Sequence, residues 1–252
     1  MKNSVRIFNS LDALSHFFSL KVAAHVGEIP HEQFFSFVLS GGSTPPKLFS
    51  YLAKNFADRI EWKKVKVFWG DERCVGPQDI ESNFRMAKEN LLDRIPITAT
   101  NIYRINGEAD PVEEAARYAE VVCRQVPLTE KVPRFDFVML GLGEDGHTAS
   151  VFPEHPELFS CDKLYSPTFN PYTNQGRITA TGKIINNAHT VTFVVTGKNK
   201  ADMVARIIEK KEGWEKLPAS LVRPDNGELF WLLDEDAASS LGKNKDFIYS
   251  KS

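Results

Sequence analysis

The sequence lacks several features that mark specialised classes of protein. Its three cysteines, Cys74, Cys123 and Cys161, are odd in number, far apart and without a CxxC pair, so they predict neither a disulfide framework nor a zinc site. No apolar run approaches the roughly 18 residues that a membrane-spanning helix needs, and no charged and then apolar leader begins the chain. We therefore expect a reduced, cytoplasmic protein.

The chain also lacks an excess of charge of either sign. Its formal net charge is −2 over 252 residues, so nothing global predicts binding to nucleic acid or to a membrane. No spacing of His, Cys, Asp or Glu resembles a metal site, because even His147 and His155 are separated by Pro153. We therefore expect no metal, and a small molecule is the favoured partner.

What the sequence does contain is an alternation of apolar runs and amphipathic segments. The near-continuous apolar runs predict strands at 34–39, 65–69, 137–140, 190–195 and 229–233. Residues 5–8 predict a short edge strand, RITAT at 177–181 a further strand, and residues 101–105 a possible one, whereas 154–176 is predicted to be irregular. Amphipathic spacing predicts helices near 11–26, 45–56, 83–92, 111–125 and 201–208. This alternation favours an α/β fold, with a mostly parallel sheet and helices on both faces, in one domain of residues 1–252.

A glycine-rich turn follows the first central strand. Ser40, Gly41, Gly42, Ser43 and Thr44 lead into a helix for which Thr44 is the predicted N-cap and the next residue is a proline. Exposed N–H groups and the helix dipole favour a phosphate at such a place. A tight strand-to-helix turn without a ligand is the alternative. No Gly-Lys-Ser/Thr ends the motif, so it is not a nucleotide-binding P-loop.

Charged residues directly follow the second central strand. Asp71, Glu72 and Arg73 come after the apolar run VKVFW, which is unusual unless solvent or a ligand meets them. An arginine can bind phosphate or carboxylate oxygens with two hydrogen bonds. A surface ion pair is the commoner alternative for such a triplet.

The stretch FDFVMLGLGEDGHTASVFP at 135–153 carries the candidate for proton transfer. An apolar strand runs into a loop with three glycines, Asp145 and His147, at the strand end where ligands bind in open α/β sheets. Histidine can exchange a proton near neutral pH without a large pKa shift. A structural histidine is the alternative. The glycines match G-x-G-x-x-G, but no helical pattern and no acid-ending strand follow, so we reject a dinucleotide site.

Two further cations stand where a phosphate ligand would be placed. Lys200 follows a predicted strand at the start of a helix, and Arg177 begins RITAT. Each could equally be a solvated surface charge, and neither is decisive alone.

Five motifs together resemble a known family. They are LSGGSTPP at 39–46, FWGDER at 68–73, GLGEDGHTASVFP at 141–153, RITAT at 177–181 and TGKNKA at 196–201, and they occur in this order in 6-phosphogluconolactonases. The related glucosamine-6-phosphate deaminases share the framework. The resemblance spans about Phe34 to Leu233, and GxGxDGHTAS–FP is its most specific part.

The resemblance implies a Rossmann-like fold and hydrolysis of 6-phospho-D-glucono-1,5-lactone, the second step of the oxidative pentose phosphate pathway. By match of motif, His147 would be the catalytic base with Asp71, Arg73 and Asp145 close by. The same match implies that the phosphate would be bound by Ser40 to Thr44, Arg177 and Lys200. The family uses no metal or cofactor for this reaction. The sequence does not reveal the oligomeric state, and we expect a monomer.

Two alternatives remain. A deaminase of the same family carries a Glu after its Asp-Gly-His, in a setting like DGHIAFNEP, whereas the fifth residue after His147 is Phe152. The deaminases also have Asp-Glu-Tyr where this chain has Asp71-Glu72-Arg73, so both departures favour the lactonase. A non-catalytic sugar-phosphate sensor is the other alternative, although sensing a phosphate needs no base such as His147.

Overall fold

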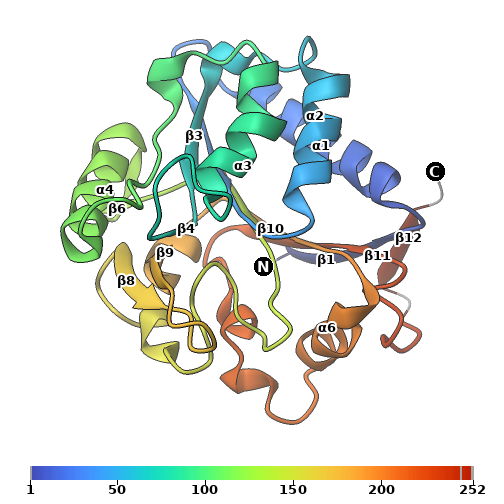
Figure 1. Ribbon diagram of the computed structural model, residues 1–252. Coiled ribbons are helices and arrows are strands. Elements are labelled where there is room, and N and C mark those ends of the chain that lie inside the picture. The colour runs from blue at the N-terminus through green and yellow to red at the C-terminus, as the bar shows by residue number, and fades with distance from the viewer. Residues whose placement is uncertain (1, 245, 251–252) are drawn as a thin grey trace.

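The computed structural model describes residues 2–244 and 246–250, and its centre is a sheet of seven parallel strands (Figure 1). These strands are β1 (Lys2–Phe8), β2 (Phe35–Leu39), β3 (Val65–Trp69), β7 (Phe137–Leu140), β10 (Thr190–Val195), β11 (Glu228–Asp234) and β12 (Phe247–Ser250). Their order is β12-β1-β11-β10-β7-β2-β3, and each neighbouring pair is parallel. The predicted mostly parallel sheet is confirmed.

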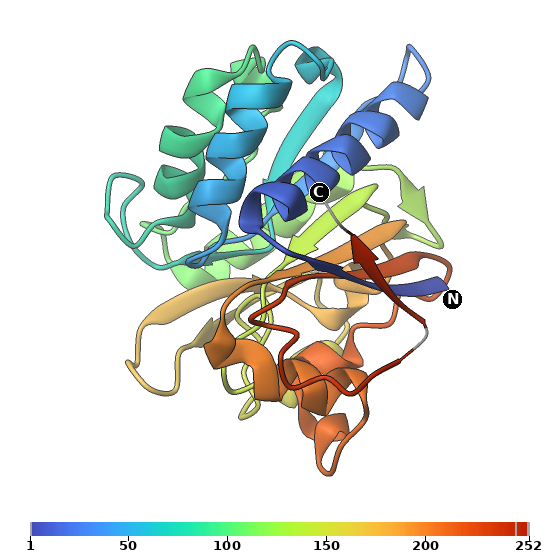
Figure 2. The ribbon, with the colours of Figure 1, turned by 90° about the vertical axis from the view of Figure 1, so that its right-hand side faces the viewer.

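Helices cover both faces of this sheet, as the sequence predicts (Figure 2). On one face lie α1 (Leu11–Glu28), α2 (Pro45–Phe56) and α3 (Asn83–Asn90), and on the other lies α6 (Ala201–Ile208). The helix α4 (Pro111–Gln125) begins at the predicted place because Asp110 accepts hydrogen bonds from the N–H groups of Val112 and Glu113. Across the described residues, no helix has both the length and the apolarity that crossing a lipid bilayer requires.

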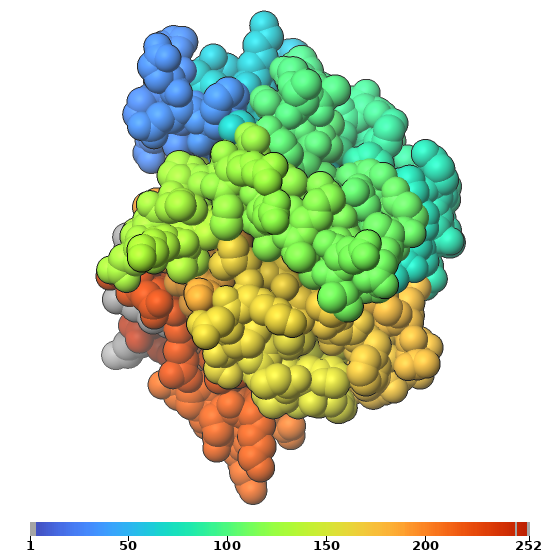
Figure 3. Space-filling model, turned by 90° about the vertical axis from the view of Figure 1, so that its left-hand side faces the viewer, coloured from blue at the N-terminus to red at the C-terminus, as the bar shows by residue number. Residues whose placement is uncertain are grey.

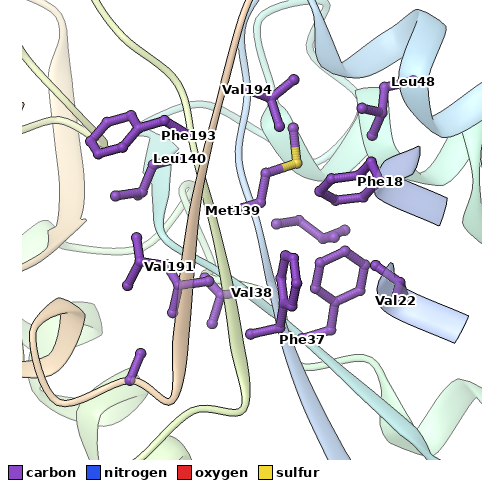
Figure 4. Close-up of a cluster of buried hydrophobic side chains, with 14 of the residues drawn as sticks. Phe18, Val22, Phe37, Val38, Leu48, Met139, Leu140, Val191, Phe193 and Val194 are labelled. Carbon is purple, nitrogen blue, oxygen red and sulfur yellow. The ribbon is translucent and has the colours of Figure 1, made fainter. Parts of the chain in front are cut away.

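The core fills the space between the sheet and its two helical layers (Figure 4). Alternate residues of a strand point to opposite faces, so Met139 lies with Phe18 of α1, whereas Leu140 lies with Phe193 on the other side. Every residue of β2, β7 and β10 is buried. This two-sided burial is the reason that these strands appear in the sequence as continuous apolar runs.

A second, antiparallel sheet lies beside the parallel one; the sheet was not predicted, but the strand predicted at 177–181 is confirmed as one of its members. It has the order β4-β9-β8 and consists of β4 (Asp71–Arg73), β8 (Tyr165–Phe169) and β9 (Gly176–Ala180). Figure 3 shows the α4 region in green against the region of β8 and β9 in yellow and gold. Tyr118 of α4 packs edge-on against Tyr165 of β8, with ring centroids 4.8 Å apart. The expectation of an irregular segment at 154–176 is therefore wrong for residues 165–169.

Two further sequence expectations need correction. The strand β1 is not at the edge, because β12 pairs along its outer side. No strand was predicted at 247–250, and within β12 only Phe247 is buried. Residues 101–105 form no strand of their own; Ile102 makes a single bridge to Val67. The remaining short elements are η1 (Trp62–Lys64), η2 (Leu92–Arg94), η3 (Ala99–Asn101), β5 (Leu128–Thr129), β6 (Val132–Pro133), η4 (Pro156–Phe159), α5 (Gly182–Ile185), η5 (Lys198–Lys200), η6 (Trp214–Lys216) and η7 (Pro218–Leu221).

Candidate active site

A cavity of about 160 Å³ lies at the carboxyl ends of the central strands β2, β7 and β10. This is the edge at which open parallel sheets bind their ligands. Seven residues singled out in the sequence meet on its wall: Ser40, Gly41, Gly42, Ser43, Thr44, His147 and Lys200. The other four, Asp71, Arg73, Asp145 and Arg177, lie behind or beside this wall.

The turn between β2 and α2 forms one side of the cavity. Gly42 has a φ of +109°, which a residue with a side chain rarely adopts. Among the described residues, no hydrogen bond uses the backbone N–H of Gly42, Ser43 or Thr44. Three free donors at the start of a twelve-residue helix are suited to binding an anion.

Thr44 differs from its expected role. It stands at the N-cap position, but its side chain makes no cap hydrogen bond. Its Oγ1 instead lies 2.7 Å from Oγ1 of Thr196, which follows β10. The hydroxyl therefore links two loops of the cavity wall, while Pro45 occupies the first turn of the helix as expected.

His147 and Asp145 form a hydrogen-bonded pair on the opposite side. Nδ1 of His147 lies 2.6 Å from Oδ1 of Asp145, and the backbone N–H of His147 donates to the same oxygen at 3.0 Å. An ionised carboxylate only accepts hydrogen bonds, so Nδ1 carries the proton and Nε2 is left as the basic nitrogen. Burial opposes ionisation of Asp145, but the hydrogen bonds from His147 outweigh it and lower the pKa of Asp145 to about 2.

The glycine-rich loop is built closely around this pair. A Cβ at Gly143 would lie 2.1 Å from Nδ1 of His147 and 2.5 Å from Oδ1 of Asp145. Only glycine therefore lets the backbone pass beneath the two side chains. The ring of Phe152 packs against the imidazole, with centroids 4.6 Å apart, and fixes its plane.

Lys200 reaches the cavity from the loop after β10. Its side chain is only 18% exposed, and Nζ lies 3.9 Å from Oε1 of Glu144. Asn199 donates to the same Glu144 oxygen at 2.6 Å, so this loop is tied to the loop at 141–153 that carries His147, the histidine loop. Burial lowers the pKa of Lys200, and the charges of Glu144 and Asp145 partly oppose that shift.

Within the charged triplet of β4, Glu72 has a structural role that the expectation of a solvent- or ligand-facing cluster did not include. Glu72 is buried and accepts hydrogen bonds from the N–H groups of Asn83 and Phe84 at 2.7 and 2.8 Å, so it caps α3. Burial raises the pKa of Glu72, although these N–H groups act in the opposite direction. Asp71 accepts a hydrogen bond from Oγ of Ser150 at 2.7 Å and thereby fixes the end of the histidine loop.

Arg73 and Arg177 lie side by side in the small sheet. They are register partners of β4 and β9, so their side chains share a face. In the described part of the chain, Nε of each arginine is buried without a hydrogen-bond partner. Burial, together with the charge of Arg73, lowers the pKa of Arg177. Arg73 also lines a neighbouring cavity of about 480 Å³, which shares Gly42 with the first. A buried Arg177 and a partly buried Arg73, each with a spare Nε donor, favour an anion between or beside them.

Three residues of this site were not singled out from the sequence. Asn83 lies against Gly41, and Nδ2 of Asn83 donates to the carbonyl of Asp71 at 2.9 Å. Thr196 joins the cavity wall through Thr44. Tyr172 donates from its hydroxyl to Oδ2 of Asp145 at 3.0 Å. Of the three, only Thr196 lies in a motif described above, TGKNKA at 196–201. The contacts of Asn83 and Tyr172 form only when distant parts of the chain come together.

No group of three or more His, Cys, Asp or Glu residues in the described ranges 2–244 and 246–250 could hold a metal ion.

Comparisons with known proteins place this arrangement among its relatives. Residues 10–231 match a family model described as glucosamine-6-phosphate isomerases/6-phosphogluconolactonase. A 6-phosphogluconolactonase of Treponema pallidum is 42% identical over 169 residues, which are 67% of this chain and 70% of that protein. One from Haemophilus influenzae is 41% identical over 204 residues, 81% of this chain and 86% of that protein. The solved structure of 6-phosphogluconolactonase from Trypanosoma brucei has a TM-score of 0.82 and 28% identity, covering 96% of this chain and 99% of that one.

Proposed function

Because the chain belongs to the glucosamine-6-phosphate isomerase/6-phosphogluconolactonase family, we propose that it is an enzyme that hydrolyses 6-phospho-D-glucono-1,5-lactone to 6-phospho-D-gluconate, the second step of the oxidative pentose phosphate pathway. The observation that supports this most is the His147–Asp145 pair facing a cavity whose other wall is an anion-binding turn. A base and an anion site within one cavity suit a phosphorylated substrate with a hydrolysable group.

The proposed chemical step uses His147 as a general base. A lactone carbonyl is already electrophilic, so an activated water is a sufficient nucleophile. Nε2 of His147 takes a proton from the water as its oxygen attacks the carbonyl carbon. The resulting tetrahedral oxyanion then re-forms the carbonyl and expels the ring oxygen, to which the imidazolium returns the proton. Asp145 stays ionised and stabilises the imidazolium.

The oxyanion needs hydrogen-bond donors where its charge develops. Backbone N–H groups of the glycine-rich loop and the guanidinium of Arg73 are the candidates. Asp71 acts in the proposal through Ser150, because its bond to that residue fixes the loop that carries His147.

The phosphate is assigned to the turn at 40–44 and to Lys200. The free N–H groups of the turn and the half-buried ammonium lie on one cavity wall and support this assignment. Arg177 remains in the proposal as a third phosphate ligand, because its guanidinium is buried beside Arg73 with an unpaired Nε. Binding this remote group would hold the lactone ring against His147.

We also propose that the chain acts as one domain, as a monomer and in the cytoplasm. One contiguous core extends from Ile7 to Phe247 and supports a single domain. The three cysteines are free, as is usual in a reducing compartment. Light scattering on the purified protein tests the monomer.

A turnover assay with three arms tests the proposal. The purified protein is given the phosphorylated lactone, glucosamine-6-phosphate, or the unphosphorylated lactone, and spontaneous lactone hydrolysis is subtracted. We expect turnover of the first and little of the others. Release of ammonia from glucosamine-6-phosphate would instead establish the deaminase. Binding of sugar phosphates without any turnover would establish the sensor.

A further inference from the structure

We propose that Tyr172 is a positioning residue that holds Asp145 in the orientation in which it supports His147. The expected effect of Tyr172 on catalysis rests on the proposed function, whereas its expected effect on the orientation of Asp145 does not. Tyr172 belongs to the loop between β8 and β9 in the small sheet, a part of the chain separate from the loop that carries the pair (Figure 1).

The bonds of the Asp145 carboxylate carry the argument. Its Oδ1 accepts from both Nδ1 and the backbone N–H of His147, so the face toward the imidazole is satisfied. Its Oδ2 accepts from the hydroxyl of Tyr172 at 3.0 Å. The tyrosine thus bonds the oxygen that the histidine leaves free. Rotation of the carboxylate away from Nδ1 would break the bond to Tyr172.

Tyr172 does not line the cavity with His147, so we assign it no contact with substrate. Its influence passes through Asp145 alone. The bond to Asp145, with a smaller effect of burial, raises the pKa of the Tyr172 hydroxyl and so favours its protonated, donating form. The other charged groups near the pair are Glu144, Lys200 and Glu154.

The loop that carries Tyr172 is itself ordered by hydrogen bonds. Oδ1 of Asn170 accepts from the N–H groups of Tyr172 and Thr173 at 2.8 and 3.2 Å. Asn174 has a φ of +55° and donates its N–H to the carbonyl of Asn170. Gln175 donates to the carboxylate of Glu81 at 2.7 Å. The ring is 67% exposed, yet its backbone is fixed on both sides.

The kinetic test is Tyr172→Phe, which removes the hydroxyl and keeps the ring. Loss of one net hydrogen bond in the pair should lower kcat by about 3–10-fold. KM should stay within about twofold, because no binding group is lost. Tyr249→Phe, at an exposed tyrosine of β12, is the matched control and should leave both constants unchanged.

A double-mutant cycle separates positioning from a general structural role. In an Asp145→Ala background the hydroxyl has no carboxylate to hold, so adding Tyr172→Phe should change kcat by less than about 1.5-fold. An equal loss in both backgrounds would assign Tyr172 a role that bypasses Asp145 and overturn the inference.

A measurement without substrate keeps the inference independent of the proposed reaction. NMR of ¹⁵N-labelled protein gives the rate at which the His147 Nδ1 proton exchanges with water. We expect this exchange to be at least about threefold faster in Tyr172→Phe than in the wild type or in Tyr249→Phe. A ratio of about this size is what the loss of one hydrogen bond produces. Unchanged exchange contradicts the inference even if the lactone is hydrolysed. Faster exchange in a protein that does not hydrolyse the lactone overturns only the proposed function.

Discussion

Gly143→Ala is the substitution that most directly tests how the histidine loop is built. The glycine lies in the loop after β7 and has an ordinary negative or extended φ, so alanine fits the backbone there. The added methyl group, however, would lie 2.1 Å from Nδ1 of His147 and 2.5 Å from Oδ1 of Asp145. Those two atoms are joined by the 2.6 Å bond of the pair. The new Cβ therefore collides with the hydrogen bond itself.

The geometry sets the size of the effect. Ordinary contacts of a Cβ begin at 3.4 Å, so the imidazole must move by more than about 1 Å to accept the methyl group. Such a movement breaks the bond to Asp145 or carries Nε2 away from the attacking water. Misplacement of a catalytic group by about 1 Å can cost ~10²-fold in rate. We expect kcat to fall by about that factor while the fold is retained.

The assay is steady-state hydrolysis of the phosphorylated lactone, with circular dichroism and thermal unfolding of both proteins. Gly27→Ala is the matched control, because Gly27 is exposed in α1 with nothing within 4 Å of its added Cβ. It should leave kcat unchanged. If Gly143→Ala folds like the wild type and keeps kcat within about threefold, the reasoning is refuted. Either His147 is then not the catalytic base, or the loop moves to accept the methyl group without displacing the imidazole.

Three further predictions concern other groups of the site. His147→Gln removes the base, so kcat in the lactone assay should fall ~10²–10⁴-fold with unfolding temperature unchanged; a fall below about threefold would move the base to another residue. Lys200→Ala should raise KM by roughly 5–150-fold, the equivalent of ~1–3 kcal/mol, with little effect on kcat. Burial lowers the pKa of Lys200 below 10.5, so the ammonium loses its charge at a lower pH than a free lysine. The wild-type KM should therefore begin to rise at a pH below 10.5, and the variant should lack this rise. For Asp145, the folded-state pKa of about 2 lies below the ordinary 3.8, so ionisation of Asp145 should contribute about 2 kcal/mol of stability above pH 4, lost as pH falls toward 2. Urea unfolding of wild type and Asp145→Asn at pH 6 and pH 3 checks this, since the difference between them should shrink at the lower pH.

The sequence predicts the central sheet and most of the cavity for one physical reason. Strands covered on both faces must be apolar at every position, so β2, β7 and β10 are visible as continuous runs. In a parallel sheet, their carboxyl ends meet at one edge. The groups that follow each run, such as Gly42, His147 and Lys200, therefore come together without any long-range information beyond the fold class.

In the second sheet only β9, predicted from RITAT at 177–181, is visible to sequence reasoning, and its pairing partners are not. Asp71 to Arg73 is too short and too polar for a strand signal, and it becomes one only by pairing with β9. The link between Tyr165 and Trp69 joins residues 96 positions apart, and that between Tyr172 and Asp145 joins residues 27 apart. Local propensity carries no information about either. Thr44 shows the same limit, because a residue with a suitable local sequence for capping uses its side chain in a contact with Thr196, 152 positions away.

The small antiparallel sheet also contains two locally destabilising features. Like charges placed directly opposite one another destabilise a sheet, yet Arg73 faces Arg177 across β4 and β9. Each arginine buries an Nε without a hydrogen bond among the described residues, which adds a desolvation cost. A bound anion would offset both terms, since it screens the repulsion and accepts the spare donors. Departures from local rules are expected at functional sites. The arginine pair next to Gly42 is therefore better explained by the proposed phosphate-bearing substrate than by the stability of the folded chain.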